Sequence, residues 1–261
     1  MSSPNNSPNH SQNNTNNEVK SIQPHWAAPA NVHVYTSTRQ GGVSSGAYQC
    51  LNLADHVGDD PLLVMENRNL WQASIEVPSA LPWLSQVHST CVVDAKEALS
   101  GILEADAQVT NEPEQACVIM TADCLPVVFA SIHGDEVAAA HAGWRGLADG
   151  MLSNTLAAMQ TNNSDICAWI GPAISQKHFE VGGDVYEAFV TKDVAYVKYF
   201  KVVDESHYLC DLSAIAKHEL MSLGVSDVSG GDYCTYADDE HFFSYRRDGQ
   251  CGRMATVIWF E

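Results

Sequence analysis

Residues 121–146 read TADCLPVVFASIHGDEVAAAHAGWRG, and the apolar runs within and beside this stretch decide the fold. Short apolar runs bounded by turn signals predict buried strands at 116–120, 125–130 and 137–140. Cys124 lies where one such run breaks and the next begins, and His141 ends the third run. We therefore expect the two side chains to lie at strand ends, where they can share a metal.

A second imidazole, that of His88, lies upstream in the motif Gln86-Val87-His88. It precedes Cys124 by 36 residues (124 − 88), and Cys124 precedes His141 by 17 (141 − 124). Gaps this long and unequal differ from the short paired spacings of structural zinc sites, and three protein ligands leave a fourth tetrahedral position for water or substrate. The pattern is typical of a catalytic metal. The alternative is a small buried thiol beside two structural histidines, because 8 Cys and 11 His make chance combinations common.

The charge and the cysteine content exclude several classes of protein. The 261 residues include 13 Lys and Arg against 32 Asp and Glu, a formal net charge of −19, with no Lys/Arg-rich run. Binding to nucleic acid or to an anionic membrane is therefore not expected, and an anionic substrate would need a few placed arginines. The 8 cysteines form no CxxC pair, which favours reduced thiols in a cytoplasmic protein. We expect a monomer.

The chain divides into a short tail and one domain. The first 17 residues are rich in Asn and Ser and lack the apolar segment of a secretion signal or membrane span. We predict a disordered tail over residues 1–20 and a single catalytic domain over residues 21–261. Further helices are predicted at 61–75, 147–159, 184–190 and 211–223. Further strands are predicted at 32–36, 83–95, 166–170, 196–200 and 254–260. This mixture indicates an α+β fold.

Several polar residues near these motifs are candidates for substrate binding. The glycine-rich loop at 38–46 contains Arg39 but matches neither GxxxxGK[ST] nor GxGxxG, so it is a weak nucleotide motif. Trp144 and Arg145 directly follow the His141 strand and lie between two glycines, which favours an anion-binding or ring-stacking role. The alternatives are that Arg145 forms an ion pair with a carboxylate and that Trp144 is a core aromatic. Three further titratable groups are candidates for proton transfer or for supporting the ligands: His56, Asp106 and Asp123.

Several familiar catalytic motifs are missing from the sequence. His178-Phe179-Glu180 resembles the HxE half of a zinc deaminase signature, but no PCxxC follows it. HExxH and GxSxG are also absent. No HxH pair occurs, and a multicopper oxidase needs clustered histidines for several coppers, so laccase chemistry is not expected.

Taken together, the motifs resemble those of the YfiH/laccase-domain family. The two most specific are Thr121-Ala122-Asp123-Cys124-Leu125-Pro126 and His141-Ala142-Gly143-Trp144-Arg145-Gly146. Four others match in family order: Leu51-Asn52-Leu53, His56-Val57-Gly58-Asp59, Gln86-Val87-His88 and Ser244-Tyr245-Arg246-Arg247-Asp248. The resemblance runs from about Val32 to the C-terminus, with Cys50 and Ser89 as minor departures.

This resemblance implies a fold, a metal and an activity. The fold is a single-domain α/β/β/α sandwich similar to the catalytic domain of cytotoxic necrotizing factor. The metal, zinc or alternatively copper, is held by His88, Cys124 and His141. The activity is that of a purine nucleoside phosphorylase, which uses phosphate to cleave adenosine, inosine and methylthioadenosine to the base and (methylthio)ribose 1-phosphate, and which also deaminates adenosine.

The resemblance also suggests roles for other residues. Arg145, supported by Arg39 or Arg247, is predicted to meet phosphate, and Asp106 or Asp123 to transfer protons. The remaining predicted substrate contacts are Asn52, His56 and Trp144.

Two other hypotheses remain open at this point. In the first, Cys124 is a nucleophile and His141 its base in a hydrolase that edits peptidoglycan precursors by removing misincorporated L-Ser. In the second, the protein is a metal-stabilised binding protein without turnover. Metal content and thiol alkylation separate the first from the metal enzyme, because a bound thiolate resists alkylation.

Overall fold

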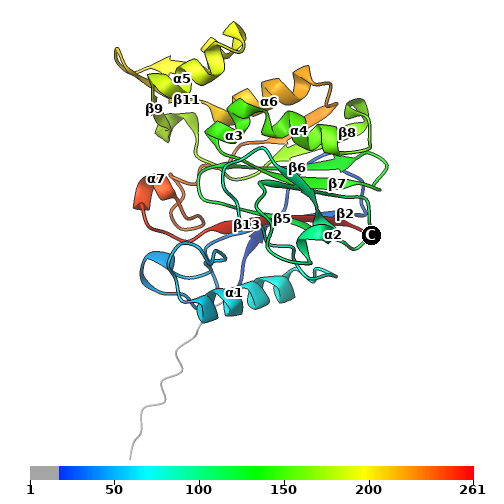
Figure 1. The fold of residues 1–261 in the computed structure, drawn as a ribbon. Helices are drawn as coiled ribbons and strands as arrows, with labels where there is room; N and C mark the ends of the chain where they lie inside the picture. Colours follow the sequence, from blue (N-terminus) through cyan, green and yellow to red (C-terminus); the bar gives the residue numbers. More distant parts are fainter. Residues whose placement is uncertain (1–17) are drawn as a thin grey trace, which may run out of the picture.

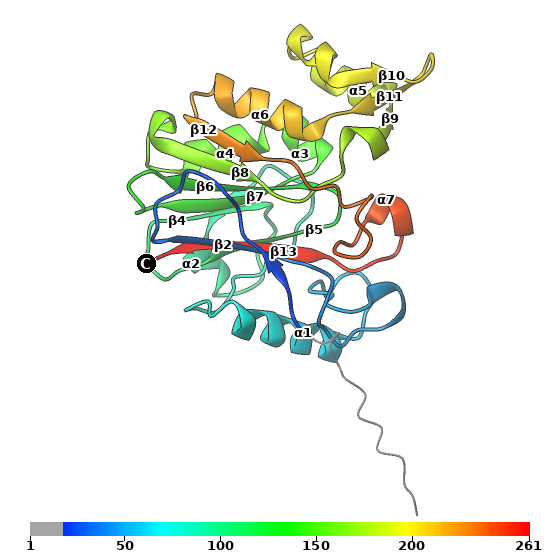
Figure 2. The same ribbon diagram turned by 180° about the vertical axis from the view of Figure 1, so that it is seen from behind.

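A computed structural model describes residues 18–261 of the chain (Figure 1). Two sheets lie face to face, and helices cover the outer face of each sheet (Figures 1 and 2). Helix α1 (Pro61–Ser74) covers one face, and the other face is covered by α3 (Trp144–Asp149), α4 (Met151–Ala158) and α6 (Leu212–Ser222). The predicted α+β class is confirmed.

The first sheet has four antiparallel strands. Their order is β1 (Ser21–Ile22), β2 (Val32–Ser37), β13 (Met254–Phe260) and β5 (Cys117–Thr121). The pairing of β13 with β5 places Met254 opposite Thr121, so the last strand of the chain lies beside the start of the 121–146 stretch. Helix α1 begins as predicted at Pro61, where the Asp60 side chain accepts a hydrogen bond from the Leu62 N–H.

The second sheet has six strands and is mixed. Their order is β12 (Asp227–Gly230), β8 (Ile166–Ile170), β6 (Leu125–Ser131), β7 (Val137–Ala142), β4 (Ala107–Thr110) and β3 (Val92–Asp94). The outer pairs β12–β8 and β3–β4 are parallel, and the inner pairs are antiparallel. Strands β5, β6 and β7 are buried along their whole length, which explains why they appear in the sequence as continuous apolar runs without alternation.

Three apolar cores separate the layers. Trp71 of α1 is fully buried in the core that packs against Val118 and Val257 of the four-stranded sheet. A second core lies between the two sheets, and a third between the six-stranded sheet and the helices on its outer face. Each sheet therefore buries both faces, and the strand ends are the places where polar side chains gather.

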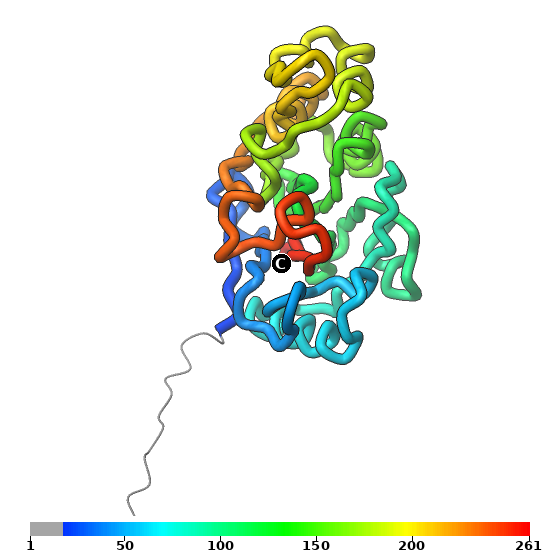
Figure 3. Tube along the Cα trace, turned by 90° about the vertical axis from the view of Figure 1, so that its left-hand side faces the viewer, coloured from blue at the N-terminus to red at the C-terminus, as the bar shows by residue number. Residues whose placement is uncertain are grey.

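A smaller antiparallel sheet extends from one end of the molecule (yellow in Figure 3). Its strands are β10 (Phe200–Val202), β11 (His207–Cys210) and β9 (Glu180–Gly182), and α5 (Gly183–Val190) follows β9. The short helices of the connections are α2 (Ala95–Ala98), α7 (Tyr245–Asp248) and the 3-10 turns Gly46–Tyr48, Asn163–Asp165, Gln176–His178 and Val194–Tyr199.

Three predicted elements differ from the structure. The helix predicted at 147–159 is two helices, because Gly150 adopts a left-handed φ of 96° between them. The strand predicted at 196–200 is mostly the 3-10 turn Val194–Tyr199. The strand predicted at 83–95 is reduced to β3, because backbone N–H groups of residues 87–89 donate to a carboxylate instead of to a neighbouring strand.

The predicted tail lies mostly outside the described residues. Of residues 1–20, only 18–20 are described, and the carbonyl of Lys20 accepts a hydrogen bond from the Thr38 N–H at 2.9 Å. In the described part of the chain, every helix is too short or too polar to cross a membrane.

Candidate metal centre and its cavity

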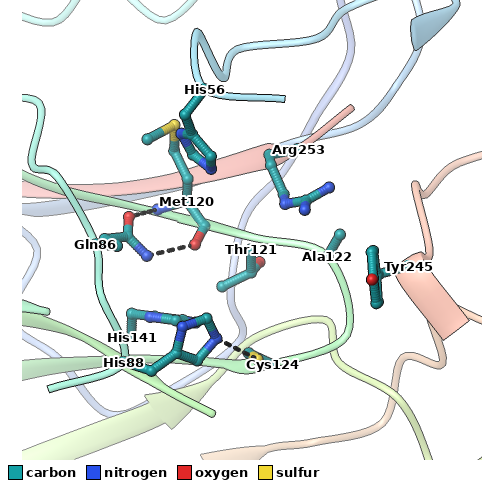
Figure 4. A pocket seen from close by; sticks show the side chains of 10 residues that line it. All are labelled: His56, Gln86, His88, Met120, Thr121, Ala122, Cys124, His141, Tyr245 and Arg253. Atoms are coloured by element: carbon teal, nitrogen blue, oxygen red, sulfur yellow. Dashed lines mark hydrogen bonds between the residues drawn. The ribbon is translucent and has the colours of Figure 1, made fainter. Parts of the chain in front are cut away.

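Two loops and one strand bring the predicted ligands together. Cys124 lies in the turn between β5 and β6, His141 lies in β7, and His88 lies in the loop before β3. Because β6 and β7 are antiparallel neighbours with Pro126 opposite His141, Cys124 comes to the same end of the pair as His141. The Nε2 atom of His88 is 4.0 Å from Cys124 Sγ, and all three ligand atoms lie within 4.8 Å of one another (Figure 4).

The carboxylate of Asp106 holds the loop that carries His88. It is fully buried and accepts hydrogen bonds from the N–H groups of Val87, His88 and Ser89 at 3.3, 3.1 and 2.6 Å. The Ser89 hydroxyl donates to it as well, at 2.8 Å. These contacts hold His88 at a φ of 60°, a left-handed conformation that is uncommon for a residue other than glycine. The loop is therefore shaped by Asp106.

Asp106 also orients His141. Its Oδ1 lies 2.8 Å from His141 Nδ1, which leaves the Nε2 of that ring for a metal. Burial alone would raise the pKa of Asp106, but hydrogen bonds from His141 and Ser89 outweigh it and lower the pKa below its usual value. The proton-transfer role predicted for Asp106 requires access to substrate, whereas the carboxylate lies buried among these donors. Its contacts support a positioning role.

The donor set fits a metal of the zinc type. Thiolate sulfur and imidazole nitrogen are both zinc ligands, and in a tetrahedral zinc site a Cys sulfur and a His nitrogen lie about 3.6 Å apart. The 4.0 Å between His88 and Cys124 needs only a small closure. A Cβ on Gly143 would lie 3.0 Å from both Cys124 Sγ and His88 Cδ2, so glycine leaves the ligands free to close. Within residues 18–261, no second cluster of three such side chains occurs.

Cys124 and His141 form a charged pair in the metal-free protein. Burial alone would raise the pKa of the Cys124 thiol, but the charge of His141 and hydrogen bonds from His141 and His88 outweigh it and lower the pKa to about 6. Burial alone would lower the pKa of His141, but the Cys124 thiolate and the Asp106 carboxylate outweigh it and raise the pKa to about 9. Between these values Cys124 is a thiolate, the form in which cysteine binds a metal or attacks an electrophile.

Iodoacetamide should therefore alkylate Cys124 of the metal-free protein at a rate that rises through a midpoint near pH 6, because the thiolate is the reacting form. Zinc should suppress the reaction. Peptide mass spectrometry measures the rate at Cys124, and the exposed thiol of Cys91 in the same sample is the reference for reagent activity. A midpoint at the value of an ordinary thiol, about 8.5, would contradict the charged pair.

A cavity of about 400 Å³ opens beside the three ligands, within the usual range for small-molecule sites (Figure 4). Its ten lining residues are His56, Gln86, His88, Met120, Thr121, Ala122, Cys124, His141, Tyr245 and Arg253. Arg253 is the only permanent cation among them. Its Nη1 donates to the carbonyls of Cys251 and Gly252, while its Nε and Nη2 have no hydrogen-bond partner within residues 18–261. This leaves two donor nitrogens, with three N–H groups, for a ligand.

His56, predicted as a substrate contact, also lines the cavity. Burial and, to a lesser degree, the charge of Arg253 lower the pKa of its imidazole. His56 is therefore mostly neutral near pH 7 and able to accept or donate a proton.

The other residues predicted to contact phosphate or the base lie outside this cavity. Arg145 is exposed, with its guanidinium carbon 4.2 Å from the centre of the Trp144 ring. Arg39 donates from Nε and Nη2 to the carbonyl of Gln49 at 3.0 and 2.9 Å. Arg247 donates to three carbonyls between residues 235 and 242 and pairs with its neighbour in the chain. The two latter guanidinium groups hold the loops around the site.

Asn52 and Asp123 hold neighbouring segments in place. Asn52 is fully buried, and its Oδ1 accepts a hydrogen bond from the Arg253 N–H at 3.0 Å. Asp123 accepts from the Thr235 hydroxyl at 2.6 Å and from the Arg246 N–H at 2.7 Å. Neither residue lines the cavity. Asn52 therefore positions Arg253, and Asp123 ties the turn that carries Cys124 to helix α7.

Four polar or aromatic residues of the cavity were not predicted as site residues from the sequence: Gln86, Thr121, Tyr245 and Arg253. The first three lie inside the motifs already noted, so their position next to candidate ligands was an available signal. Gln86 clamps the Met120 backbone with two hydrogen bonds, at 2.8 and 2.7 Å. Arg253 carried no such signal, because it reaches the cavity through a strand pairing between residues 133 apart (254 − 121).

Comparison with known proteins adds a family and close relatives. Residues 33–261 match a family described as multi-copper polyphenol oxidoreductase laccase. A purine nucleoside phosphorylase of Haemophilus influenzae is 49% identical over 93% of this chain and 100% of its own length. The purine nucleoside phosphorylase YfiH of Escherichia coli is 46% identical over 92% of this chain and 98% of its own.

Solved structures share the fold. The crystal structure of a Neisseria meningitidis protein of family DUF152 matches with a TM-score of 0.90 at 49% identity, covering 92% of this chain and 99% of that one. YlmD from Geobacillus stearothermophilus matches with a TM-score of 0.82 at 27% identity, covering 94% and 99%.

Proposed function

Because this chain belongs to the multi-copper polyphenol oxidoreductase laccase family, with relatives named purine nucleoside phosphorylase, we propose that it is a purine nucleoside phosphorylase of the YfiH type. It cleaves adenosine, inosine and methylthioadenosine with inorganic phosphate, and it deaminates adenosine. One observation carries the proposal: a single cavity has three candidate metal ligands on one side and Arg253 on the other (Figure 4). Metal and anion chemistry therefore meet in one site.

In phosphorolysis an oxygen of phosphate forms a bond to C1′ of the ribose while the C1′–N9 bond breaks. The purine leaves with the electron pair and takes up a proton. Arg253 binds the phosphate through its free Nε and Nη2, since a guanidinium suits an oxyanion. His56, neutral near pH 7, exchanges the proton with the purine or with phosphate.

The metal ligands supply the second part of the site. His88, Cys124 and His141 would hold zinc or, alternatively, copper, and a bound metal supplies Lewis acidity and a water of lowered pKa. Asp106 holds the His141 ring in the required tautomer and fixes the His88 loop. These protein contacts position both imidazoles.

Arg253→Met should raise the KM for phosphate by roughly 10- to 150-fold, because a hydrogen bond to a charged group contributes about 1.5–3 kcal/mol. The KM for adenosine should change far less. Arg145→Met is the matched control, since that guanidinium is exposed and lies outside the cavity. Steady-state kinetics with phosphate varied would measure both. An effect of Arg145→Met equal to that of Arg253→Met would contradict the assignment.

Chromatography of adenosine incubated with the protein, with and without phosphate, tests the proposal. Adenine that forms only with phosphate, together with inosine in either buffer, is the expected result. The proposal would be overturned if metal-loaded protein formed no phosphate-dependent adenine from adenosine and cleaved neither inosine nor methylthioadenosine.

A second candidate function rests on the same residues. The chain Asp106–His141–Cys124, with a thiol pKa of about 6, resembles the arrangement of a cysteine hydrolase. It would cleave the acyl bond of L-Ser in a peptidoglycan precursor. Muramyl-L-serine offered to chelator-treated protein separates the two functions, because a nucleophilic thiolate works without metal whereas the metal enzyme stops.

The layers of helix, sheet, sheet and helix support the α/β/β/α sandwich that the resemblance implies, with residues 21–261 as one domain. The likeness to cytotoxic necrotizing factor, the cytoplasmic location and the monomeric state stay predictions. Purine nucleosides and phosphate are the proposed partners.

A further inference from the structure

Thr121 lies in the wall of the cavity next to Arg253. It ends strand β5 and pairs with Met254, the first residue of β13, and Arg253 directly precedes Met254 in the chain. Figure 4 shows its side chain between Cys124 and Arg253, on the border between the metal side and the cationic side. The residue is only 2% exposed although it lines the cavity. Its side chain therefore forms part of the wall between the two sides.

The hydroxyl of Thr121 has no hydrogen-bond partner within residues 18–261. Buried hydroxyl groups are nearly always paired, because leaving one unpaired costs free energy. Three other buried side-chain atoms of the described chain also lack a hydrogen-bond partner, and they belong to His33, Arg68 and Ser79. None of these residues lines the cavity, so among the lining residues Thr121 has the one buried hydroxyl without a partner.

Rotation about χ1 brings this hydroxyl to the place of the methyl group without breaking a hydrogen bond, because it makes none here. The charges nearby decide which acceptor the Thr121 hydroxyl can donate to. Arg253 is the only permanent cation of the ten lining residues, and the net charge of −19 means that an anion is held only where such a cation is placed. An anion bound at Arg253 would therefore bring acceptor oxygens to the cavity that Thr121 also lines.

We propose that Thr121 is a phosphate-binding residue, whose hydroxyl donates a hydrogen bond to an oxygen of the inorganic phosphate held by Arg253. The inference rests on the proposed phosphorolysis and places phosphate on the β5–β13 side of the cavity. It leaves the space beside His56 and Gln86 to the nucleoside. Threonine can donate this hydrogen bond, whereas valine, which has the same shape, cannot.

The test compares Thr121→Val with Thr121→Ser in steady-state kinetics. Thr121→Val should raise the KM for phosphate about tenfold and leave the KM for adenosine unchanged, as expected for one lost hydrogen bond to an anion. Thr121→Ser should keep the KM for phosphate within about threefold. The melting temperature of Thr121→Val should equal or exceed that of the wild type, because no hydrogen bond within the protein is removed.

An unchanged KM for phosphate in Thr121→Val, or equal rises in the valine and serine variants, would overturn the inference. If the valine variant fails to fold, Thr121→Ala replaces it, and a KM for phosphate equal to that of Thr121→Ser would have the same meaning. Calorimetric titration with inorganic phosphate alone separates this inference from the proposed function. Phosphate binding that weakens in Thr121→Val but not in Thr121→Ser supports the site even if no nucleoside is cleaved, and equal binding rejects it.

Discussion

Replacing Cys124 by alanine should abolish metal binding and lower kcat/KM for phosphorolysis by roughly 10³-fold or more. Only two imidazoles would remain, and one of them, His88, is exposed. A bound metal stabilises a transition state by several kcal/mol, and about 4 kcal/mol of stabilisation corresponds to a rate factor of roughly 10³. Metal content by elemental mass spectrometry and adenosine kinetics on the same preparation measure both effects. Deamination should be lost together with phosphorolysis, because both are assigned to one centre.

Cys91→Ala is the matched control, because Cys91 is a free, exposed thiol that does not line the cavity. It should keep full metal content and activity. Turnover by Cys124→Ala without bound metal would contradict the shared centre. Loss of activity in Cys124→Ala while chelator-treated wild type stays active would instead identify Cys124 as a nucleophile and favour the hydrolase.

Replacing Asp106 by asparagine should weaken metal binding by about 10- to 100-fold, the usual cost of losing a group that orients a ligand. The amide NH₂ of asparagine is a hydrogen-bond donor, and it would face groups that donate to the carboxylate in the wild type. These groups are the N–H groups of residues 87–89 and His141 Nδ1. We also expect the free energy of unfolding of the metal-free protein to fall by about 3–5 kcal/mol, because a buried charged partner is removed. Chelator competition and urea unfolding measure the two effects.

The same variant should change the dependence of stability on pH. The pKa of Asp106 is lower in the folded protein than its ordinary 3.8, so its contribution to stability is present above about that pH and is lost as the pH falls through the folded value. Asp106→Asn should therefore flatten the acid side of the stability curve. Asp135→Asn, at an exposed position, is the control and should leave metal affinity and the curve unchanged. Equal effects of both substitutions would rule out the positioning role.

Much of the fold follows from short segments of sequence. Strands β5, β6, β7 and β13 lie within two residues of their predicted positions, because each is an apolar run long enough to cross a sheet that is buried on both faces. The strand predicted at 83–95 was wrong over most of its length because tertiary contacts replaced ladder hydrogen bonds. Asp106 takes the N–H groups of residues 87–89, so no strand forms there.

The site was likewise predictable only in part. Cys124 and His141 could be paired from sequence because they end neighbouring strands of one stretch, and His88 joined them through its motif. The proposed phosphate contacts could not be found from composition. Arg39 and Arg247 have attractive positions in the sequence, yet both donate to nearby backbone carbonyls and hold loops.

By itself, the sequence determined the α+β class, the buried central strands and the three residues with the chemistry to hold a metal, because apolar runs and ligand types are local properties. Only the tertiary structure decided which cation and which threonine line the same cavity as those ligands. Arg253 and Thr121 come to one cavity because β13 pairs with β5 across 133 residues (254 − 121). Asp106 supports both histidines because β4 lies beside β7. The physical reason is that hydrogen-bond donors and acceptors find their partners only after the sheets assemble, and those partners decide which polar groups remain free for a substrate.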